Sequence, residues 1–469
     1  MSENKNQRIH FIAIGGAVMH NMAIALHNKG HRVSGSDDEI FEPARSNLAN
    51  HGLLPDKQGW FAGKITPDID AVILGMHAKN DNPELEKAVA LGLKIYSFPE
   101  YLYQHSKQKT RVVIAGSHGK TTITSMVMHV LRHIGQDFDY LVGAKVEGFD
   151  VMVKLTDAPI MVIEGDEYLT SPTDPRPKFL HYHPHIALIS GIAWDHINVF
   201  PSWEGYKQQF ELFIESIGTE GTLVYCADDE VLQEVISRCS ANKNCPHNVL
   251  PYHEFPSKIK NGTTYLLPDE NHKAEVPLRI FGRHNLQNLA GAQLVCRELG
   301  ISDVVFYQAI TTFTGAARRL ECIAQNDTMV VYKDFAHAPS KVTATVAAIQ
   351  NQYPERRLVA VLELHTFSSL SRHFLGHYRH SLDPADVAVV FYSHHALQLK
   401  KLPPITPQEV IDGFGRSDLN VFTQAEELLE FLLSQNYANS NLLMMSSGSF
   451  DGIDQHGLAK KIVSSAEKL

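Results

Sequence analysis

Short apolar runs alternate with helical patterns along this whole sequence, and this rhythm limits the possible folds more than any other feature. The first run is RIHFIAI at residues 8–14; Gly15 and Gly16 follow it, then a helical stretch over 21–29 and an expected strand over 31–36. Further runs of this kind lie at 71–74, 94–98, 112–115, 160–163 and 186–189. Such runs, separated by helices, are typical of parallel sheets covered on both faces. We therefore expect an α/β protein made of doubly wound units.

The chain length of 469 residues predicts roughly three domains, at about 150 residues each. Polar segments at 104–110 and 314–319 mark the expected boundaries. Residues 251–277 are richer in polar and turn residues, which indicates a small β excursion within the middle domain. The third domain begins with expected strands at 320–323 and 329–332. The expected domains cover residues 1–108, 109–315 and 316–469.

Composition excludes several classes of protein. With 44% hydrophobic and 20% charged residues, the chain is not mainly disordered, and it contains no apolar run of the roughly 18 residues that a membrane helix needs. Its polar start, MSENKNQRIH, predicts no signal peptide. The formal charge of −10 opposes non-specific binding to nucleic acid, and five cysteines without a CxxC pair favour a reducing compartment. We expect a cytoplasmic protein without nucleic-acid or membrane partners.

A phosphate-binding turn is the sharpest local signal. The segment RVVIAGSHGKTT at 111–122 places an expected strand before a glycine-rich turn and a helical stretch after it. Glycines let backbone N–H groups surround phosphate oxygens, and the helix N-terminus favours negative charge. Lys120 can reach the β- and γ-phosphates, and the hydroxyl of Thr121 can bind Mg²⁺. Because Ile114 stands where GxxxxGK[ST] has glycine, the match is to a shorter GxxGK[ST] form. A tight structural connection is the alternative, and the turn does not distinguish ATP from GTP.

Acidic and histidine residues follow two further expected strands of the middle domain. Glu164 begins the sequence EGDE at the end of one strand, where a magnesium ligand or a solvated acidic loop is expected. His196 follows the strand at 186–189 and could reach a second metal. His181, His183 and His185 alternate in HYHPH and could share one strand face, although solvent-facing histidines are the favoured interpretation.

The first glycine turn indicates a second nucleotide site. Gly15 and Gly16 follow a strand and would let the backbone approach a diphosphate, and Asp37 ends the next strand, where a ribose hydroxyl could bind. The pattern is not GxGxxG, so a UDP-sugar site is favoured over a dinucleotide site, and a packing turn is the remaining alternative. His77 and Asn82, in a loop after the run at 71–74, are expected at the same sheet edge.

Taken together, the motifs resemble those of the Mur ligase family, the ATP-dependent amide ligases of peptidoglycan assembly. The motifs that carry the resemblance occur in this order: GSHGKTT (116–122), EGDEY (164–168), WDH (194–196), GRHNLQN (282–288), RRLE (318–321) and DFAHAP (334–339). The resemblance implies a Rossmann-like N-terminal domain that binds a UDP-sugar, a central P-loop ATPase domain and a C-terminal Rossmann-like domain that binds the amine substrate. Segment 15–37 resembles the UDP-sugar domain of the branch that uses UDP-N-acetylmuramate. Within that branch, segments 166–184 and 200–213 most resemble members that join L-alanyl-γ-D-glutamyl-meso-diaminopimelate to this acid in peptidoglycan recycling.

The resemblance also implies roles for individual residues. Catalytic roles fall to Lys120, His196, Arg319 and Asp334. ATP would be bound by Gly116, Ser117, His118, Gly119, Lys120, Thr121, Thr122, Asn285, Asn288, Arg319, Asp334 and His337. The UDP-sugar would be bound by Gly15, Gly16, Met19, Asp37, His77 and Asn82. Mg²⁺ would be held by Thr121, Glu164 and His196. ATP would phosphorylate the muramyl carboxylate, and the amine of the murein tripeptide would attack the resulting acyl phosphate.

The sequence departs from the family pattern at several positions. Lys333 precedes Asp334 where an acidic residue is frequent, and Ala338 replaces a second histidine. Phe210 occupies the position of a carbamylated lysine that bridges metals in more distant members. The segment ELHTFSS at 363–369, expected to face the amine, matches no family signature closely.

Three other functions remain as alternatives. A ligase that adds free L-alanine to UDP-N-acetylmuramate shares nearly all these motifs. An ATP-driven switch without ligation would share the phosphate-binding turn, and a nicotinamide-dependent dehydrogenase is disfavoured by the N-terminal pattern. The chain is expected to be a monomer or weak homodimer.

Overall fold

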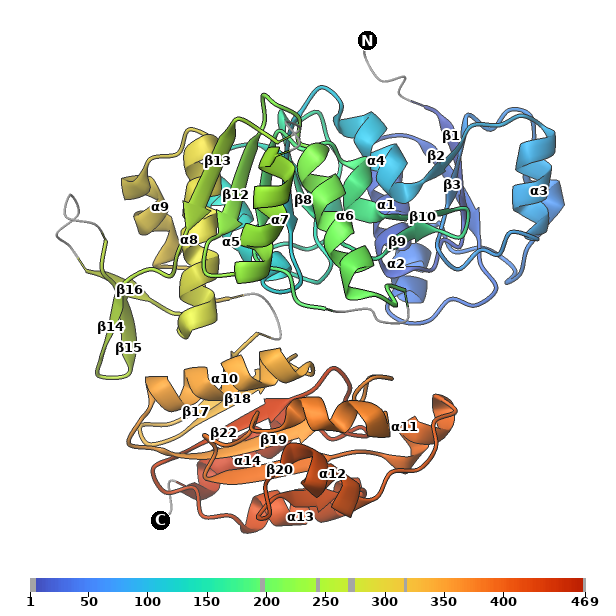
Figure 1. Cartoon of the computed structure of the whole chain (residues 1–469). Helices are drawn as coiled ribbons and strands as arrows, with labels where there is room; N and C mark the ends of the chain where they lie inside the picture. The colour runs from blue at the N-terminus through green and yellow to red at the C-terminus, as the bar shows by residue number, and fades with distance from the viewer. Residues whose placement is uncertain (1–5, 195–198, 242–244, 269–274, 316–318, 467–469) are drawn as a thin grey trace. The chain divides into compact units, whose positions relative to one another are not determined.

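A computed structural model describes residues 6–194, 199–241, 245–268, 275–315 and 319–466. The chain divides into two compact units. The first contains Met1–Phe255 and Gln287–Ile310, and the second contains Pro256–Leu286 and Thr311–Leu469. Each unit is built around parallel sheets with helices between the strands, so the α/β class expected from the sequence is confirmed (Figure 1). Among the described residues, no helix is long and apolar enough to cross a bilayer.

The first unit begins with a four-stranded sheet of order β2-β1-β3-β4, in which every pair is parallel. Its strands are β1 (Arg8–Ile12), β2 (Arg32–Ser36), β3 (Ala71–Leu74) and β4 (Ile95–Ser97). Its helices are α1 (Ala17–Asn28), α2 (Ala44–Asn50), the 3-10 helix η1 (Ala62–Lys64), α3 (Pro83–Ala90) and α4 (Phe98–Ser106). Parallel pairing brings the ends of β1, β2 and β3 to one edge, where Gly15, Asp37 and His77 follow these strands.

The first unit also contains a seven-stranded sheet of order β13-β12-β11-β5-β8-β6-β7. All neighbours are parallel except β6 and β7. Its strands are β5 (Thr110–Ala115), β6 (Phe138–Leu141), β7 (Val153–Lys154), β8 (Ile160–Glu164), β11 (Ile186–Ile189), β12 (Thr222–Cys226) and β13 (Asn248–Tyr252). A hairpin of β9 (Leu169–Ser171) and β10 (Asp174–Pro177) follows β8. Because β5 lies between β8 and β11, the loops after these three strands meet at one edge.

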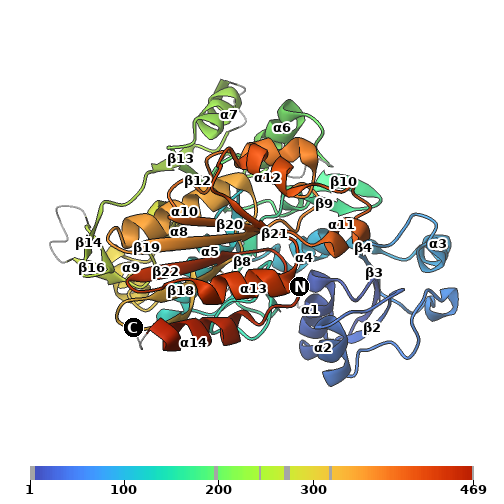
Figure 2. The same ribbon diagram turned by 90° about the horizontal axis from the view of Figure 1, so that it is seen from below.

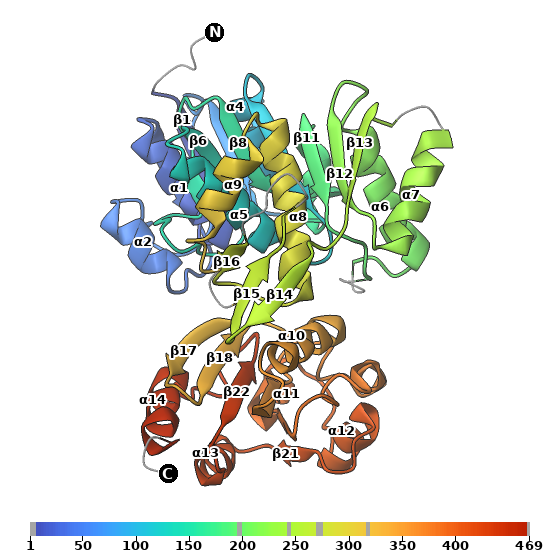
Figure 3. The same cartoon turned by 90° about the vertical axis from the view of Figure 1, so that its left-hand side faces the viewer.

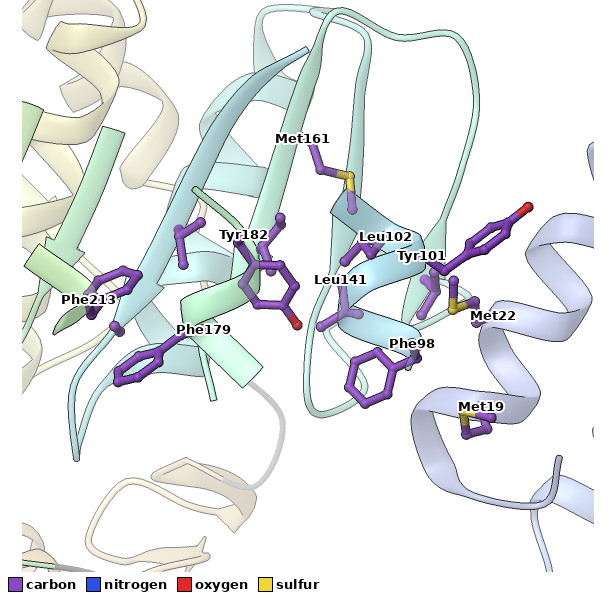
Figure 4. Packing of buried hydrophobic residues seen from close by; sticks show 14 of the residues in the cluster. Met19, Met22, Phe98, Tyr101, Leu102, Leu141, Met161, Phe179, Tyr182 and Phe213 are labelled. Atoms are coloured by element: carbon purple, nitrogen blue, oxygen red, sulfur yellow. The ribbon is translucent and has the colours of Figure 1, made fainter. Parts of the chain in front are cut away.

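Helices cover both faces of the seven-stranded sheet. They are α5 (Lys120–His133), η2 (Lys178–His181), α6 (Trp203–Glu215), α7 (Glu230–Ala241), α8 (Arg283–Glu298) and α9 (Asp303–Ile310). The pair α5 and α9 and the pair α6 and α7 lie on opposite sides of the strands (Figure 3). One apolar core continues from α1 through α4 to η2 and α6, and Figure 4 shows Met19, Met22, Phe98 and Phe179 within it.

The second unit contains a six-stranded sheet of order β17-β18-β22-β19-β20-β21, parallel except at β17. The strands are β17 (Glu321–Gln325), β18 (Val330–Asp334), β19 (Arg357–Glu363), β20 (Val387–Phe391), β21 (Asn420–Phe422) and β22 (Ser440–Met445). The helices are α10 (Pro339–Gln352), η3 (Arg372–Tyr378), α11 (His394–Leu399), α12 (Pro407–Phe414), α13 (Ala425–Ser434) and α14 (Gln455–Ala466). Separate cores fill the two faces: α10 and α12 pack on one, α13 and α14 on the other (Figure 2).

The β excursion expected at 251–277 is an antiparallel sheet of order β14-β15-β16. Its strands are β14 (Ser257–Lys260), β15 (Thr263–Leu266) and β16 (Val276–Leu278). This sheet groups with the second unit, whereas we expected it to lie in the domain that contains the phosphate-binding turn. The expected domain boundaries at 108 and 315 stay predictions.

The favoured interpretation, that His181, His183 and His185 face solvent, holds for His183 and His185 but is wrong for His181, and the three do not share a strand face. His181 ends the 3-10 helix η2 and is buried, whereas His183 and His185 are exposed. Pro184 and the positive φ of 43° at His183 break any regular strand before β11 begins.

Candidate functional site

The phosphate-binding turn connects β5 to α5, as the sequence predicts. Gly116 and Gly119 have φ values of 119° and 77°, which residues with a Cβ rarely adopt. Space is restricted as well: a Cβ on Gly119 would lie 2.3 Å from Oδ1 of Asn288. Gly119 is the N-cap of α5 and, as a glycine, provides no side-chain cap. Backbone N–H groups of the first helical turn are therefore available to phosphate oxygens.

Lys120 is held between the turn and the acidic loop, which we define as residues 164–167. Its Nζ donates to the carbonyl oxygen of Gly116 at 2.7 Å and to Oε2 of Glu167 at 2.7 Å. Burial works against the charge of the ammonium group, but Glu167 and the nearby Asp166 and Glu164 raise the pKa of Lys120 above its ordinary value. Lys120 is therefore positively charged at neutral pH, as contact with a triphosphate requires.

Thr121 and Glu164 provide adjacent oxygen atoms beside Lys120. The Thr121 hydroxyl donates to Oε1 of Glu164 at 2.9 Å, and the N–H of Gly143 donates to Oε2 at 2.8 Å. Burial raises the pKa of Glu164, while Gly143, Lys120 and Thr121 act in the opposite direction. A hydroxyl and a carboxylate beside a phosphate-binding turn fit the oxygen ligands that Mg²⁺ prefers. The third expected metal ligand, His196, lies outside the described residues.

Ser117 links the turn to α6 and to the segment after β11. Its Oγ lies 3.0 Å from the hydroxyl of Tyr206 and accepts from the N–H of Ala193 at 2.8 Å. The N–H of Ser117 donates to the carbonyl oxygen of Gly191 at 3.0 Å. Nδ1 of the neighbouring His118 lies 2.7 Å from the carbonyl oxygen of Ser117. The other residue predicted here, Thr122, is buried in the first turn of α5.

The two asparagines of α8 have different surroundings. Asn288 is buried and its side chain lies against Gly119, so it borders the phosphate-binding turn. Asn285 donates from Nδ2 to the carbonyl oxygen of Phe281 at 2.8 Å and groups with the second unit. Of this predicted pair, Asn288 lies beside the turn, and the role of Asn285 stays a prediction.

Arg319, Asp334 and His337 come together within the second unit, at the end of β18. The Arg319 guanidinium lies over the Phe335 ring, 5.1 Å from its centroid, and Nδ1 of His337 lies 2.8 Å from the carbonyl oxygen of Phe335. Asp334 accepts from the N–H groups of Leu320 at 2.7 Å and Ala336 at 2.6 Å. Burial raises the pKa of Asp334, and the Arg319 charge opposes this shift.

At the N-terminal glycine turn, Gly15 and Asp37 are in direct contact. The N–H of Gly15 donates to Oδ2 of Asp37 at 2.6 Å, and a Cβ on Gly15 would lie 2.9 Å from the same oxygen. Burial raises the pKa of Asp37 to about 6, although the N–H of Gly15 opposes the shift. Gly16, the N-cap of α1, has no side-chain cap, so this helix N-terminus resembles that of α5.

The other residues predicted to bind the sugar nucleotide are less suitably placed for contact with it. His77 is exposed in the turn after β3. Oδ1 of Asn82 accepts from the N–H groups of Glu84 at 2.9 Å and Leu85 at 3.2 Å, so its side chain caps α3. Met19 is buried in the core, as Figure 4 shows, and contacts Gly16 rather than an open surface. Sequence reasoning missed Glu167 and Tyr206: Glu167 follows Glu164 in the quoted motif, but nothing local to Tyr206 indicates its contact with Ser117.

The phosphate-binding turn at the centre of a parallel sheet, with an acidic loop beside its lysine, defines an α/β enzyme that uses a nucleoside triphosphate. Three domain models of one family match successive parts of the chain. They are the catalytic domain of the Mur ligase family over residues 8–110, the Mur ligase middle domain over 114–296 and the Mur ligase glutamate ligase domain over 318–448. The chain belongs to the Mur ligase family, whose members are ADP-forming peptide ligases.

Individual relatives cover most of the chain. The UDP-N-acetylmuramate–L-alanyl-γ-D-glutamyl-meso-2,6-diaminoheptandioate ligase of Haemophilus influenzae is 27% identical over 463 residues, covering 97% of this chain and 99% of its own. The UDP-N-acetylmuramate–L-alanine ligase of Caldicellulosiruptor bescii is 32% identical over 394 residues, covering 81% and 82%. The structure of a murein peptide ligase from Psychrobacter arcticus matches with a TM-score of 0.62 at 22% identity and covers 99% of both chains. This structure supports the fold.

Proposed function

We propose that this chain joins the amino group of L-alanyl-γ-D-glutamyl-meso-diaminopimelate to the lactyl carboxylate of UDP-N-acetylmuramate, with conversion of ATP to ADP and phosphate. The observation that carries the proposal is Lys120, a cation at the start of α5 with carboxylates beside it. End-to-end similarity to the Haemophilus influenzae tripeptide ligase supports the choice of substrates.

The proposed reaction begins with activation of the acid. A carboxylate oxygen of UDP-N-acetylmuramate attacks the γ-phosphorus of ATP, and ADP leaves, which gives an acyl phosphate. The main obstacle is repulsion between two anions. Lys120 would bind the β- and γ-phosphates and move from Glu167 to do so, and the N–H groups at the start of α5 would stabilise charge on the phosphate oxygens. Thr121 and Glu164 would hold Mg²⁺, which supplies further neutralisation of the phosphate charge when bound.

The second step forms the amide bond. The neutral amine of the tripeptide attacks the acyl carbon, and the tetrahedral intermediate loses phosphate while the nitrogen loses a proton. We assign Arg319, Asp334 and His337 to nucleotide contact, because the Arg319 guanidinium is close to both Asp334 and the ring of Phe335. Gly15, Gly16 and Asp37 would bind the UDP group at the N-terminus of α1, where the helix dipole favours a diphosphate.

A ligase for free L-alanine is the second candidate, because the Caldicellulosiruptor bescii relative has the higher identity, 32%, over its shorter match. To distinguish the two reactions, the purified full chain is given UDP-N-acetylmuramate and ATP together with either the tripeptide or L-alanine. ADP formation is then measured for each amine. We expect kcat/KM for the tripeptide to exceed that for L-alanine by at least about tenfold, since the site must recognise additional polar groups. Mass spectrometry would identify the amide product.

Controls that omit one substrate test the whole proposal. ADP formation without the acid and the amine would indicate an ATP-driven switch, and a preference for L-alanine would indicate the sister reaction. Lys120→Ala should abolish ADP formation, and retained turnover would refute the role of Lys120. Circular dichroism would establish that this variant remains folded. This control is needed because loss of the Lys120 ammonium group leaves the buried Glu167 without this cation.

A further inference from the structure

Glu100, Asp174 and His181 gather at a second place in the first unit, outside the phosphate-binding turn. They come from the first turn of α4, from β10 and from the end of η2. One ligand atom of each lies within 4.8 Å of the others. None of the three belongs to the site proposed for ATP, Mg²⁺ or the UDP-sugar. Figure 4 shows that α4 and the segment of Phe179 and Tyr182, which contains His181, pack in the same core.

The imidazole of His181 directs a buried nitrogen toward the carboxylates. His181 is 6% exposed, and its buried Nε2 has no hydrogen-bond partner among the residues that the structure describes. This nitrogen lies 3.3 Å from Oδ2 of Asp174, yet the geometry is not that of a hydrogen bond. Burial lowers the pKa of His181, and the charge of Arg176 acts in the same direction, whereas the charges of Asp174 and Glu100 oppose this shift. A neutral imidazole with an unused nitrogen is the form that binds a metal ion.

The two carboxylates retain oxygen lone pairs that can face an ion. Oε2 of Glu100 accepts from the N–H and hydroxyl of Ser97 at 2.8 Å, which completes the cap of α4 and leaves Oε1. The charge of Glu100 also acts on Arg176 and His181. Asp174 already binds Arg176, whose Nη2 lies 2.6 Å from Oδ2. Each carboxylate oxygen has two acceptor positions, so Asp174 can bind an ion and Arg176 together, although the two positive charges repel.

We propose that Glu100, Asp174 and His181 form a binding site for a divalent first-row transition ion of the Zn²⁺ class. One imidazole and two carboxylates are a common ligand set for Zn²⁺, with water in the remaining position, whereas Mg²⁺ and Ca²⁺ prefer oxygen ligands alone. Bonds of about 2.0–2.2 Å would require the three ligand atoms to draw closer together than in the structure. These movements involve side chains on rigid elements and need no change of fold.

An ion at this position would join α4 to the hairpin and to η2. Lys178, the first residue of η2, pairs with Asp166 of the acidic loop, and its Nζ lies 5.8 Å from the ring centroid of Phe98 in α4. Asp166 is next to Glu167, the partner of Lys120. The ion would therefore fix the segment that supports the acidic loop, without contacting the reacting atoms.

Titration with Zn²⁺ and Co²⁺ tests the site. The full chain is first freed of metal by chelation, and it is then titrated in excess Mg²⁺ without nucleotide. We expect one equivalent to bind and Co²⁺ to give visible absorption without a thiolate-to-cobalt band, which excludes the free cysteines as ligands. His181→Gln should weaken the binding of Zn²⁺ and Co²⁺ at least about tenfold, which is the size of effect that substitutions around other metal sites have. Glu100→Gln should weaken it too, and this variant keeps the cap of α4 because glutamine also serves in a capping box.

Two further variants make the test specific. Arg176→Met should tighten binding, because it removes the cation that competes for Asp174. His183→Gln, a change at an exposed histidine two residues away, should leave binding unchanged. The proposal is overturned if no equivalent binds, if His181→Gln and Glu100→Gln bind as the unaltered chain does, or if Glu164→Gln abolishes binding. Thermal unfolding of the metal-free variants would show that each is folded.

Discussion

At the residue scale, the phosphate-binding turn depends on two glycines, Gly116 and Gly119, which both have positive φ and both lack room for a side chain. A Cβ on Gly116 would collide with Ser190, and a Cβ on Gly119 would collide with Asn288 of α8. The backbone conformation keeps N–H groups available at the start of α5, and the contact fixes where α8 approaches. A side chain at position 119 would therefore disturb both the turn and its neighbour.

Gly119→Ala should reduce both stability and ATP binding. A left-handed conformation costs an alanine about 1–2 kcal/mol, and the close approach to Asn288 adds to this cost. Gly218→Ala is the matched control, because Gly218 has a φ of 76° but nothing within 4 Å of a Cβ. Thermal unfolding and the KM for ATP should be measured for both. We expect the control to lose stability only, and equal ATP KM values in the two variants would contradict the role of the turn.

Asp37 should make the stability of the chain depend on pH. Its folded pKa of about 6 lies above the ordinary value of about 3.9, so the folded state binds the proton more tightly. The stabilisation is complete below about pH 4 and is lost as the pH rises through about 6. Asp37→Asn removes this loss, so the difference in melting temperature, variant minus unaltered chain, should be larger at about pH 8 than at about pH 5. The same difference at both values would show that Asp37 titrates normally.

Sequence analysis located residues near the phosphate-binding turn where their position follows from their distance along the chain to a strand end or helix start. Lys120, Thr121 and Glu164 lie at strand ends or helix starts that the apolar runs define, and parallel pairing brings them together. Asn82 was less predictable, because an asparagine before a helix can either bind a ligand or cap the helix. Here the side-chain oxygen caps α3.

At the scale of secondary-structure elements, α6 supports the phosphate-binding turn from a distant part of the sequence. Tyr206 in α6 reaches Ser117, and it packs with Phe200, Trp203 and Phe210. The sequence predicts the turn, but the contact between Tyr206 and Ser117 joins residues 89 positions apart. Long-range contacts of this kind have no local signal, because they depend on how helices pack on the finished sheet.

Tyr206→Phe should lower kcat/KM for ATP without changing the fold. The variant loses one hydrogen bond to Ser117, worth about 0.5–1.5 kcal/mol, which corresponds to a loss of roughly two- to tenfold in kcat/KM for ATP. Tyr392→Phe is a matched control, since the buried Tyr392 donates to the carbonyl oxygen of Ile405 in the second unit. Steady-state kinetics should show the loss only for Tyr206→Phe. A similar change in both variants would indicate a general effect of stability.

The boundaries of regular elements were predicted closely where apolar runs are continuous. The strands expected at 71–74 and 186–189 coincide with β3 and β11. The interpretation of HYHPH was less successful, because alternation over a few residues also fits a 3-10 turn followed by an extended segment. Only the tertiary packing of η2 determines that His181 is buried.

At the scale of the whole molecule, the chain order and the compact units do not coincide. Residues 256–286 lie in sequence between β13 and the part of α8 that begins at Gln287, yet they group with the second unit. Gln352 at the end of α10 explains part of this association: it accepts from the Thr264 hydroxyl at 2.8 Å and donates to the carbonyl oxygen of Gly262 at 2.7 Å. Sequence composition marks the β excursion but carries no information about which sheet it packs against.

Gln352→Ala should loosen the β14–β16 sheet without changing the first unit. The substitution leaves the buried Thr264 hydroxyl and the Gly262 carbonyl without this partner, at a cost of about 1–3 kcal/mol. Hydrogen exchange measured by mass spectrometry should become faster in β14, β15 and the end of α10, and remain unchanged in α5. Gln408→Ala is the control: this glutamine donates to Asp412 on the surface, so exchange should stay as it was. Unchanged exchange in β15 of Gln352→Ala would show that other contacts hold this sheet to the second unit.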